Sequence, residues 1–128
     1  MAKLLSTFSF NVNSLRLDPK LDFIAKVPSG ISDREALFSV LRDELKFPAY
    51  FGNNWDALSE CLRDLSWIPH RRVVILHEDL PSLDEREIVI YLEMISECVL
   101  DWQPDESHQL VVVFPPEARA AIADHEKR

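Results

Sequence analysis

The chain has 128 residues, of which 47% are hydrophobic, and a formal net charge of −8 at pH 7. This length provides for one domain with its own core, and no apolar run approaches the ~20 residues of a membrane-spanning helix. The acidic balance argues against direct binding of nucleic acid, because phosphate contacts need clustered lysine and arginine. A basic protein is the better-matched partner.

The two ends of the chain have weak periodicity, and the sequence leaves their structure open. The N-terminus has a broken apolar stretch and no small-residue cleavage site, so we expect a cytoplasmic protein rather than a secreted one. Residues 1–20 are interpreted as an N-terminal extension, residues 21–114 as the folded domain, and residues 115–128 as a C-terminal tail or short helix.

A first strand and helix are predicted between residues 23 and 47. Residues 23–27 (FIAKV) are a short apolar run that ends at a Pro-Ser-Gly turn, which is typical of a strand. Ser32 and Glu35 have the spacing of a capping box, with Ser32 as the N-cap of a helix that Pro48 ends.

The next helix and strand follow directly. Asn53 or Asn54 can cap a helix up to residue 65, whose buried side comprises Trp55, Leu58, Cys61, Leu62 and Leu65. Residues 71–77 (RRVVILH) form a continuous β-branched run, as expected of a central strand that is covered on both faces.

A long helix and a last strand complete the pattern. Ser82 and Glu85 form a second capping-box sequence, which begins a helix that extends to about Trp102. Residues 109–114 (QLVVVF) then form a strand. Strand, helix and strand from residue 71 to residue 114 predict parallel pairing through a right-handed crossover, and therefore an α/β fold class.

Acidic residues recur four apart on two of these helices, opposite the apolar side: Asp56, Glu60 and Asp64 on the first, and Glu93, Glu97 and Asp101 on the second. Like charges at that spacing repel by a few tenths of a kcal/mol per pair. One such column is typical of a solvated outer face. Two columns in a small domain, with Tyr50, Phe51 and Trp55 beside the first, have the composition of a protein-binding surface.

Other kinds of chemistry have little support in the sequence. Carboxylates on outward helix faces are not desolvated as acid–base catalysts need to be, which disfavours an acidic hydrolase. The four histidines share no metal-ligand spacing, and two glycines in the whole chain supply no phosphate-cradling loop. Cys61 and Cys98 lie in apolar helical patterns as reduced thiols. We therefore expect no metal, no cofactor and no enzymatic activity.

The run LKFPAYFGNNWDALSECLRDL (residues 45–65) resembles the signature of the barstar family, small acidic inhibitors of bacterial extracellular ribonucleases. The order of elements from residue 23 to residue 114 is also similar. This resemblance implies a three-stranded parallel sheet packed with helices over residues 21–114. It also implies a protein without catalytic activity that binds a nuclease and blocks its active site.

The resemblance implies a partner-binding surface around the first acidic helix, with a loop of Tyr50, Phe51 and Gly52, a contact face of Asn54, Trp55, Asp56, Ser59, Glu60 and Arg63, and outer acids Glu93 and Glu97. Glu60 takes the place of an acid that mimics the phosphate of the substrate. The family pattern has aspartate there, one methylene shorter. Ser59 stands where barstar itself has a large aromatic, and Arg63 replaces a small polar residue. We therefore expect a different cognate nuclease.

The expected function is that of a bacterial immunity protein, monomeric before binding, that inhibits a basic ribonuclease or nuclease toxin stoichiometrically. The alternative is a non-catalytic interaction module of the same fold, either monomeric or dimeric, whose partner is not a nuclease. Ile90 and Met94 favour this alternative slightly, because they lie near Glu93 and Glu97 rather than in the apolar stripe.

Overall fold

The computed structural model describes residues 3–127, so Met1, Ala2 and Arg128, which belong to the two predicted end segments, lie outside the described residues. Within this range the elements in chain order are α1 (Lys3–Thr7), the 3-10 helix η1 (Val12–Leu15), β1 (Asp22–Val27), α2 (Arg34–Glu44), α3 (Trp55–Asp64), β2 (Arg72–His77), α4 (Glu85–Asp101), β3 (Gln109–Val113), the 3-10 helix η2 (Pro116–Ala118) and α5 (Arg119–Glu126).

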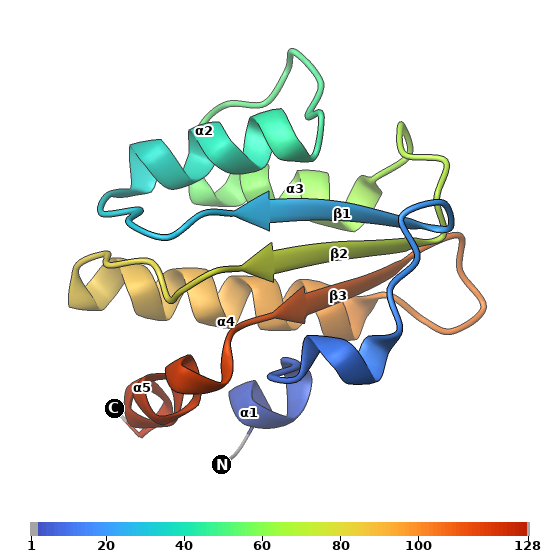
Figure 1. Cartoon of the computed structure of the whole chain (residues 1–128). Coiled ribbons are helices and arrows are strands. Elements are labelled where there is room, and N and C mark those ends of the chain that lie inside the picture. Colours follow the sequence, from blue (N-terminus) through green and yellow to red (C-terminus); the bar gives the residue numbers. More distant parts are fainter. Residues whose placement is uncertain (1–2, 128) are drawn as a thin grey trace.

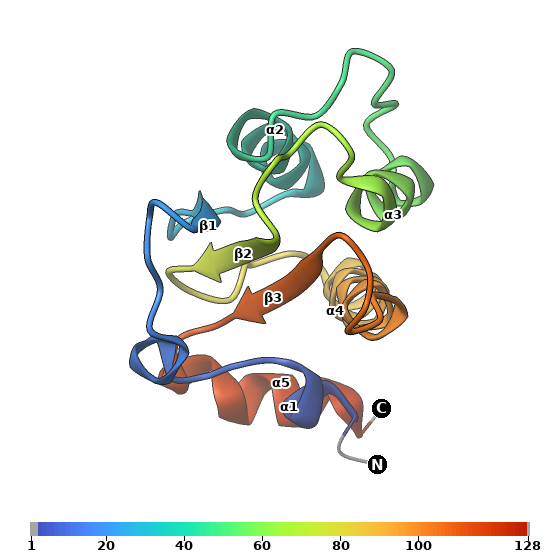
Figure 2. The same cartoon turned by 90° about the vertical axis from the view of Figure 1, so that its right-hand side faces the viewer.

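The three strands form one parallel sheet in the order β1-β2-β3, which confirms the predicted fold class and the central position of β2. In its centre Ile75 pairs with Ala25 on one side and Val112 on the other. The predicted cover of β2 on both faces is confirmed only in part, because Val74 is fully buried on the face that points away from the long helices, whereas Leu76 on that face is not. Helices α2, α3 and α4 lie on one side of the sheet (Figures 1 and 2), and Leu76, whose side chain points to the other side, is only partly buried.

The two long helices that carry capping-box sequences are capped by aspartate. The Asp33 carboxylate accepts a hydrogen bond from the Ala36 N–H at 2.8 Å, and Asp84 accepts one from the Glu87 N–H at 2.9 Å. The predicted serine caps were therefore one and two residues too early. An aspartate at this position both satisfies a free N–H group and places negative charge at the positive end of the helix dipole.

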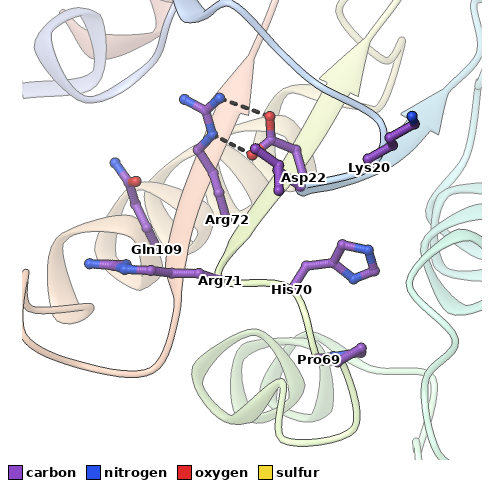
Figure 3. A pocket seen from close by; sticks show the side chains of 8 residues that line it. Lys20, Asp22, Pro69, His70, Arg71, Arg72 and Gln109 are labelled. Atoms are coloured by element: carbon purple, nitrogen blue, oxygen red, sulfur yellow. Dashed lines mark hydrogen bonds and ion pairs between the residues drawn. The ribbon is translucent and has the colours of Figure 1, made fainter.

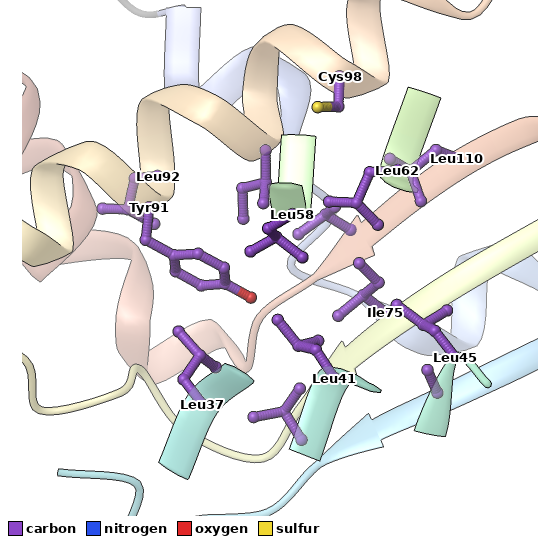
Figure 4. Packing of buried hydrophobic residues seen from close by; sticks show 14 of the residues in the cluster. Leu37, Leu41, Leu45, Leu58, Leu62, Ile75, Tyr91, Leu92, Cys98 and Leu110 are labelled. Carbon is purple, nitrogen blue, oxygen red and sulfur yellow. The ribbon is translucent and has the colours of Figure 1, made fainter. Parts of the chain in front are cut away.

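The core lies between the covered face of the sheet and these helices. Leucines of α2 and α3 meet Ile75 from the sheet and Tyr91 from α4, whose hydroxyl points into the cluster (Figure 4). Leu41, Leu58 and Ile75 have no exposed surface. Burial of each such side chain contributes roughly 2 kcal/mol, so this core fixes the position of the α3 and α4 backbones.

The two ends of the described chain pack on the edge of the sheet beside β3. Ser9 forms an isolated parallel bridge with Val113, and α1 and α5 lie side by side next to it (Figure 2). Leu4 of α1 and Ile122 of α5 are both buried in the core cluster. No helix within residues 3–127 combines the length and apolar character needed to cross a membrane.

Candidate functional site

The loop that enters α3 is held by buried aromatic rings. Phe51 is 8% exposed, and its ring packs at 4.8 Å from the ring of Phe47 and at 6.2 Å from that of Phe38. Phe51 therefore anchors the loop from within. A Cβ atom on Gly52 would lie 3.3 Å from Nδ2 of Asn54, so a larger residue there would press on the start of α3.

Tyr50, in contrast, is presented on the surface with 66% of its area exposed. Its hydroxyl donates a hydrogen bond of 3.2 Å to the Asp64 carboxylate in the last turn of α3. Desolvation raises the pKa of Tyr50, and the hydrogen bond to Asp64 raises it further, so the hydroxyl stays a proton donor. This contact ties the exposed ring to the acidic helix.

Asn54 fixes both the loop and the first turn of α3. Its side-chain oxygen accepts a hydrogen bond from the Ala57 N–H at 2.8 Å, and its amide group donates to the Gly52 carbonyl at 3.3 Å. Of the two predicted candidates Asn54 is the cap, while Asn53 adopts a left-handed backbone with φ +53°. A cap of this kind contributes about 1 kcal/mol and sets the direction in which the helix starts.

Two carboxylates of α3 share one groove. Asp56 and Glu60 are both exposed, and they line a surface groove of ≈ 630 Å³ together with Asn54, Trp55, Ala57 and Ile90. The two carboxylates of the groove therefore lie beside apolar side chains of both helices, Trp55 and Ala57 from α3 and Ile90 from α4. Such a groove accepts a cation that carries an aliphatic or aromatic stem.

Trp55 is only partly buried and belongs to both the core and the groove. Its ring packs edge-on against Phe38 at 4.8 Å and lies 6.0 Å from the ring of Tyr91. Packing on two sides holds the indole in one place. A rigid, half-exposed aromatic loses little conformational entropy when a partner covers it.

Ser59 and Arg63 lie on the side of α3 that faces α4. The Ser59 hydroxyl is 3.8 Å from the sulfur of Cys98, and burial raises the pKa of that thiol. Arg63 pairs with Asp101 of α4 at 2.8 Å. The sequence predicted that this arginine pairs with Asp56, Glu60 or an acid on the partner. The actual ion pair instead links α3 to α4, between two residues that are 38 positions apart in the sequence.

The acids of α4 remain on the surface. Glu93 and Glu97 are both exposed, and Glu97 lies 4.0 Å from the ammonium group of Lys3 in α1. The N-terminal helix thus partly offsets the charge at one end of the α4 column. An exposed pair of this length contributes little free energy.

The structure brings together most of the predicted site residues on the surface that α3 and α4 share. We use the name acidic face for the exposed carboxylates on these two helices: Asp56, Glu60, Asp64, Glu93, Glu97 and Asp101. Ile90 was predicted to lie near Glu93, and its role as a wall of the groove was missed. The Arg63–Asp101 pair was also missed, because no local spacing relates residues of two different helices. Within residues 3–127 no group of three His, Cys, Asp or Glu side chains is placed to hold a metal ion.

Comparison with known proteins supports this architecture. The family model described as barstar (barnase inhibitor) matches residues 25–121, which include the whole acidic face. The chain belongs to the barstar family. Members of this family are inhibitors that bind a ribonuclease and are not themselves enzymes. A search of curated proteins found no match.

Proposed function

We propose that this protein is a non-catalytic, stoichiometric inhibitor of a basic ribonuclease or nuclease toxin. It covers the active site of that enzyme with the acidic face, and it acts as a monomeric immunity protein in the bacterial cytoplasm. The observation that supports this most strongly is the placement of Asp56 and Glu60, which are both exposed and line one groove beside Trp55.

The physical reason lies in what a nuclease needs. Its active site gathers lysine, arginine and histidine to hold a phosphodiester and stabilise its transition state. Such a cluster attracts rigid carboxylates at phosphate-like spacing. The helix cap at Asn54 and the packing of Trp55 hold the Asp56 and Glu60 backbones in place before binding, so little ordering has to accompany association.

The choice of partner depends on Arg63 and Ser59. Because Arg63 is paired with Asp101, its charge is largely compensated within the molecule and does not stand alone before a basic enzyme. Ser59 is small and part-buried against Cys98, whereas a large aromatic side chain at this position would project further from the helix. We infer a cognate nuclease with a protruding side chain there, distinct from the enzyme that barstar inhibits.

The experiment is a binding measurement against a panel of basic ribonucleases and nuclease toxins, including those encoded beside this protein. The purified chain is immobilised, and each enzyme is passed over it at low salt. A catalytically inactive variant of each enzyme is passed over it in the same way. We expect at least one enzyme to bind with slow dissociation. Its inactive variant should bind equally well, because the inhibitor contacts the surface of the active site and does not require catalysis. Absence of binding throughout the panel would contradict the proposal.

A further inference from the structure

A second pocket lies at the edge of the sheet where all three strands begin. It has a volume of ≈ 600 Å³, and the residues that line it are Lys20, Leu21, Asp22, Pro69, His70, Arg71, Arg72 and Gln109. Figure 3 shows Arg71 and Gln109 on one side of this basic pocket and Lys20 and His70 on the other. Three of these residues are lysine or arginine and one is acidic, which is unusual in a chain with a net charge of −8.

One of the three cations is already neutralised. Arg72 donates two hydrogen bonds of 2.8 Å to the Asp22 carboxylate and a third, of 3.1 Å, to the Leu15 carbonyl. The bonds from Arg72 to Asp22 lower the pKa of Asp22 to about 2, so the carboxylate stays charged. The buried pair forms a fixed wall of the pocket and leaves its two other cations uncompensated.

Lys20 and Arg71 are those two cations. Arg71 donates one hydrogen bond of 2.7 Å to the Pro104 carbonyl, which holds its guanidinium group at the rim and leaves its remaining donors available. Within residues 3–127 neither side chain forms an ion pair with a carboxylate. The pocket therefore has two positive charges that are not paired with a carboxylate within residues 3–127.

His70, which also lines the pocket, has a ring nitrogen without a hydrogen-bond partner among the described residues. Its Nδ1 is buried and has no hydrogen-bond partner in the described structure. The ring packs edge-on against Phe23 at 5.5 Å, and the backbone carbonyl of His70 accepts a hydrogen bond of 2.8 Å from His108. A buried polar group without a partner is rare in proteins and calls for an explanation, such as a functional role or an ordered water.

We propose that this basic pocket binds a small phosphate monoester of about the size of a mononucleotide. A phosphate monoester carries a charge close to −2 at neutral pH, which matches the two uncompensated cations, whereas a carboxylate would balance only one. The planar guanidinium group of Arg71 suits a phosphate in a two-bond contact. Leu21, which is 70% exposed, and Pro69 supply apolar surface for the remainder of the ligand. The volume falls within the range of small-molecule sites, roughly 300–1,000 Å³.

The basic pocket is separate from the acidic face. Residues 69–72 follow the C-terminal end of α3, whereas the acidic groove is formed by residues 54–60 in its first half. The basic pocket and the acidic groove therefore lie near opposite ends of this helix. Binding at the basic pocket is independent of the proposed inhibition of a nuclease, and each can be tested without the other.

The test is a titration of the ¹⁵N-labelled full chain, followed through its amide resonances, with adenosine 5′-monophosphate, inorganic phosphate and adenosine. We expect the monophosphate to cause saturable shifts at residues 20–22, 70–72 and 109. Inorganic phosphate should shift the same signals with weaker affinity, since it lacks the apolar contact, and adenosine should shift none. The double variant Lys20→Gln/Arg71→Gln should bind the monophosphate at least tenfold more weakly.

A matched double variant, Lys26→Gln/Arg42→Gln, removes the same charge from exposed positions outside the pocket and should bind as the unaltered protein does. All variants change exposed side chains, and the dispersion of the same spectra reports that they are folded. The proposal is overturned if the monophosphate causes no saturable shift or if both double variants weaken binding equally. Much tighter binding of a ten-residue RNA than of the monophosphate also overturns it, because the ligand is then nucleic acid.

Discussion

Glu60 and Asp56 reach into the same groove from successive turns of α3, but their carboxylates stand at different heights because glutamate is one methylene longer. In a complex with a basic active site, the carboxylate that is fully desolvated between cations dominates the binding free energy. We assign this role to Glu60. Asp56, closer to the positive end of the helix dipole, gives additional support.

The first prediction concerns the substitutions Glu60→Gln and Asp56→Asn, which keep the shape of each side chain and remove its charge. Against the cognate nuclease, each should accelerate dissociation by at least tenfold, with a smaller effect on association. Asp105→Asn, in the exposed loop after α4, is the matched control and should change dissociation little. Surface plasmon resonance measures both rates. Equal effects of all three substitutions would mean that binding depends on the overall negative charge and not on a specific site at Asp56 and Glu60.

His77 is the residue on which the stability of the fold at low pH depends. It is fully buried, with Nδ1 2.9 Å from the Val113 carbonyl and Nε2 2.7 Å from the Tyr91 hydroxyl. A carbonyl only accepts, so Nδ1 carries the proton and Nε2 accepts from Tyr91. Burial lowers the pKa of His77 from 6.5 to about 4, and burial also raises the pKa of Tyr91, so that both groups stay neutral.

The second prediction is the resulting pH dependence of the free energy of unfolding. The unfolded chain takes up a proton on this histidine below pH 6.5, but the folded chain does so only below about pH 4. The contribution of neutral His77 is therefore complete above pH 6.5 and is lost as the pH falls to about 4, by about 3 kcal/mol in total. Urea unfolding at a series of pH values measures it.

The variants separate His77 from the other groups that titrate in acid. His77→Gln should remove most of the slope between pH 6.5 and 4, whereas His125→Gln, at a partly buried position in α5, should keep it. The Asp22–Arg72 pair stabilises the fold above pH 3.8 and loses this effect as the pH falls through about 2, outside the window of His77. An unchanged slope in His77→Gln would contradict the assignment.

At the scale of elements, the geometry of the acidic face depends on how α3 and α4 are joined. The Arg63–Asp101 ion pair connects them on the surface. Nearby, the Trp102 indole N–H donates to the Leu62 carbonyl at 2.9 Å, which satisfies a carbonyl in the last turn of α3. The buried contact supplies the rigidity, and the exposed ion pair mainly sets the local charge.

The third prediction separates these two roles with a pair of single substitutions. Arg63→Gln and Asp101→Asn both remove the ion pair, and each should change the free energy of unfolding by less than about 1 kcal/mol because the pair is exposed. Their effects on association with a basic nuclease at low salt should be opposite. Arg63→Gln should accelerate association, and Asp101→Asn, which leaves an unpaired cation, should slow it. Changes in the same direction would mean that the bridge acts through helix packing rather than charge.

The elements that local patterns specify could be predicted from the sequence, and the contacts between elements could not. The β-branched run around Ile75 and the apolar stripes on α3 and α4 indicated the sheet and its helices, because periodicity reports which side of an element is buried. The predicted positions of the α2 and α4 caps were wrong, because serine and aspartate are both favoured at the N-cap and the structure uses Asp33 and Asp84. The basic pocket was missed because it joins Lys20, Arg71 and Gln109 from three strand ends.

On the scale of the whole molecule, negative and positive charge gather on two separate surfaces. The acidic face lies on α3 and α4, and the basic pocket lies where the strands begin. The molecule therefore has an asymmetric charge distribution in addition to its net charge of −8. We expect a basic enzyme that approaches to be steered toward the acidic face.

The fourth prediction is that association with the nuclease falls steeply as salt rises, while dissociation changes little. At 0.15 M salt, charges are screened beyond about 8 Å, so steering weakens before the buried contacts do. Stopped-flow measurements of the association rate between low and physiological salt measure the effect. An association rate independent of salt would show that the acidic face does not guide the encounter.

The central claim is tested most directly by titrating the protein into a fixed amount of the nuclease that it binds and measuring the cleavage of RNA. Occupation of the active site predicts that activity falls linearly and reaches zero at one inhibitor per enzyme, and that the Glu60→Gln variant moves the curve to higher inhibitor concentration. Binding that leaves RNA cleavage unchanged at a molar excess of the protein would contradict it.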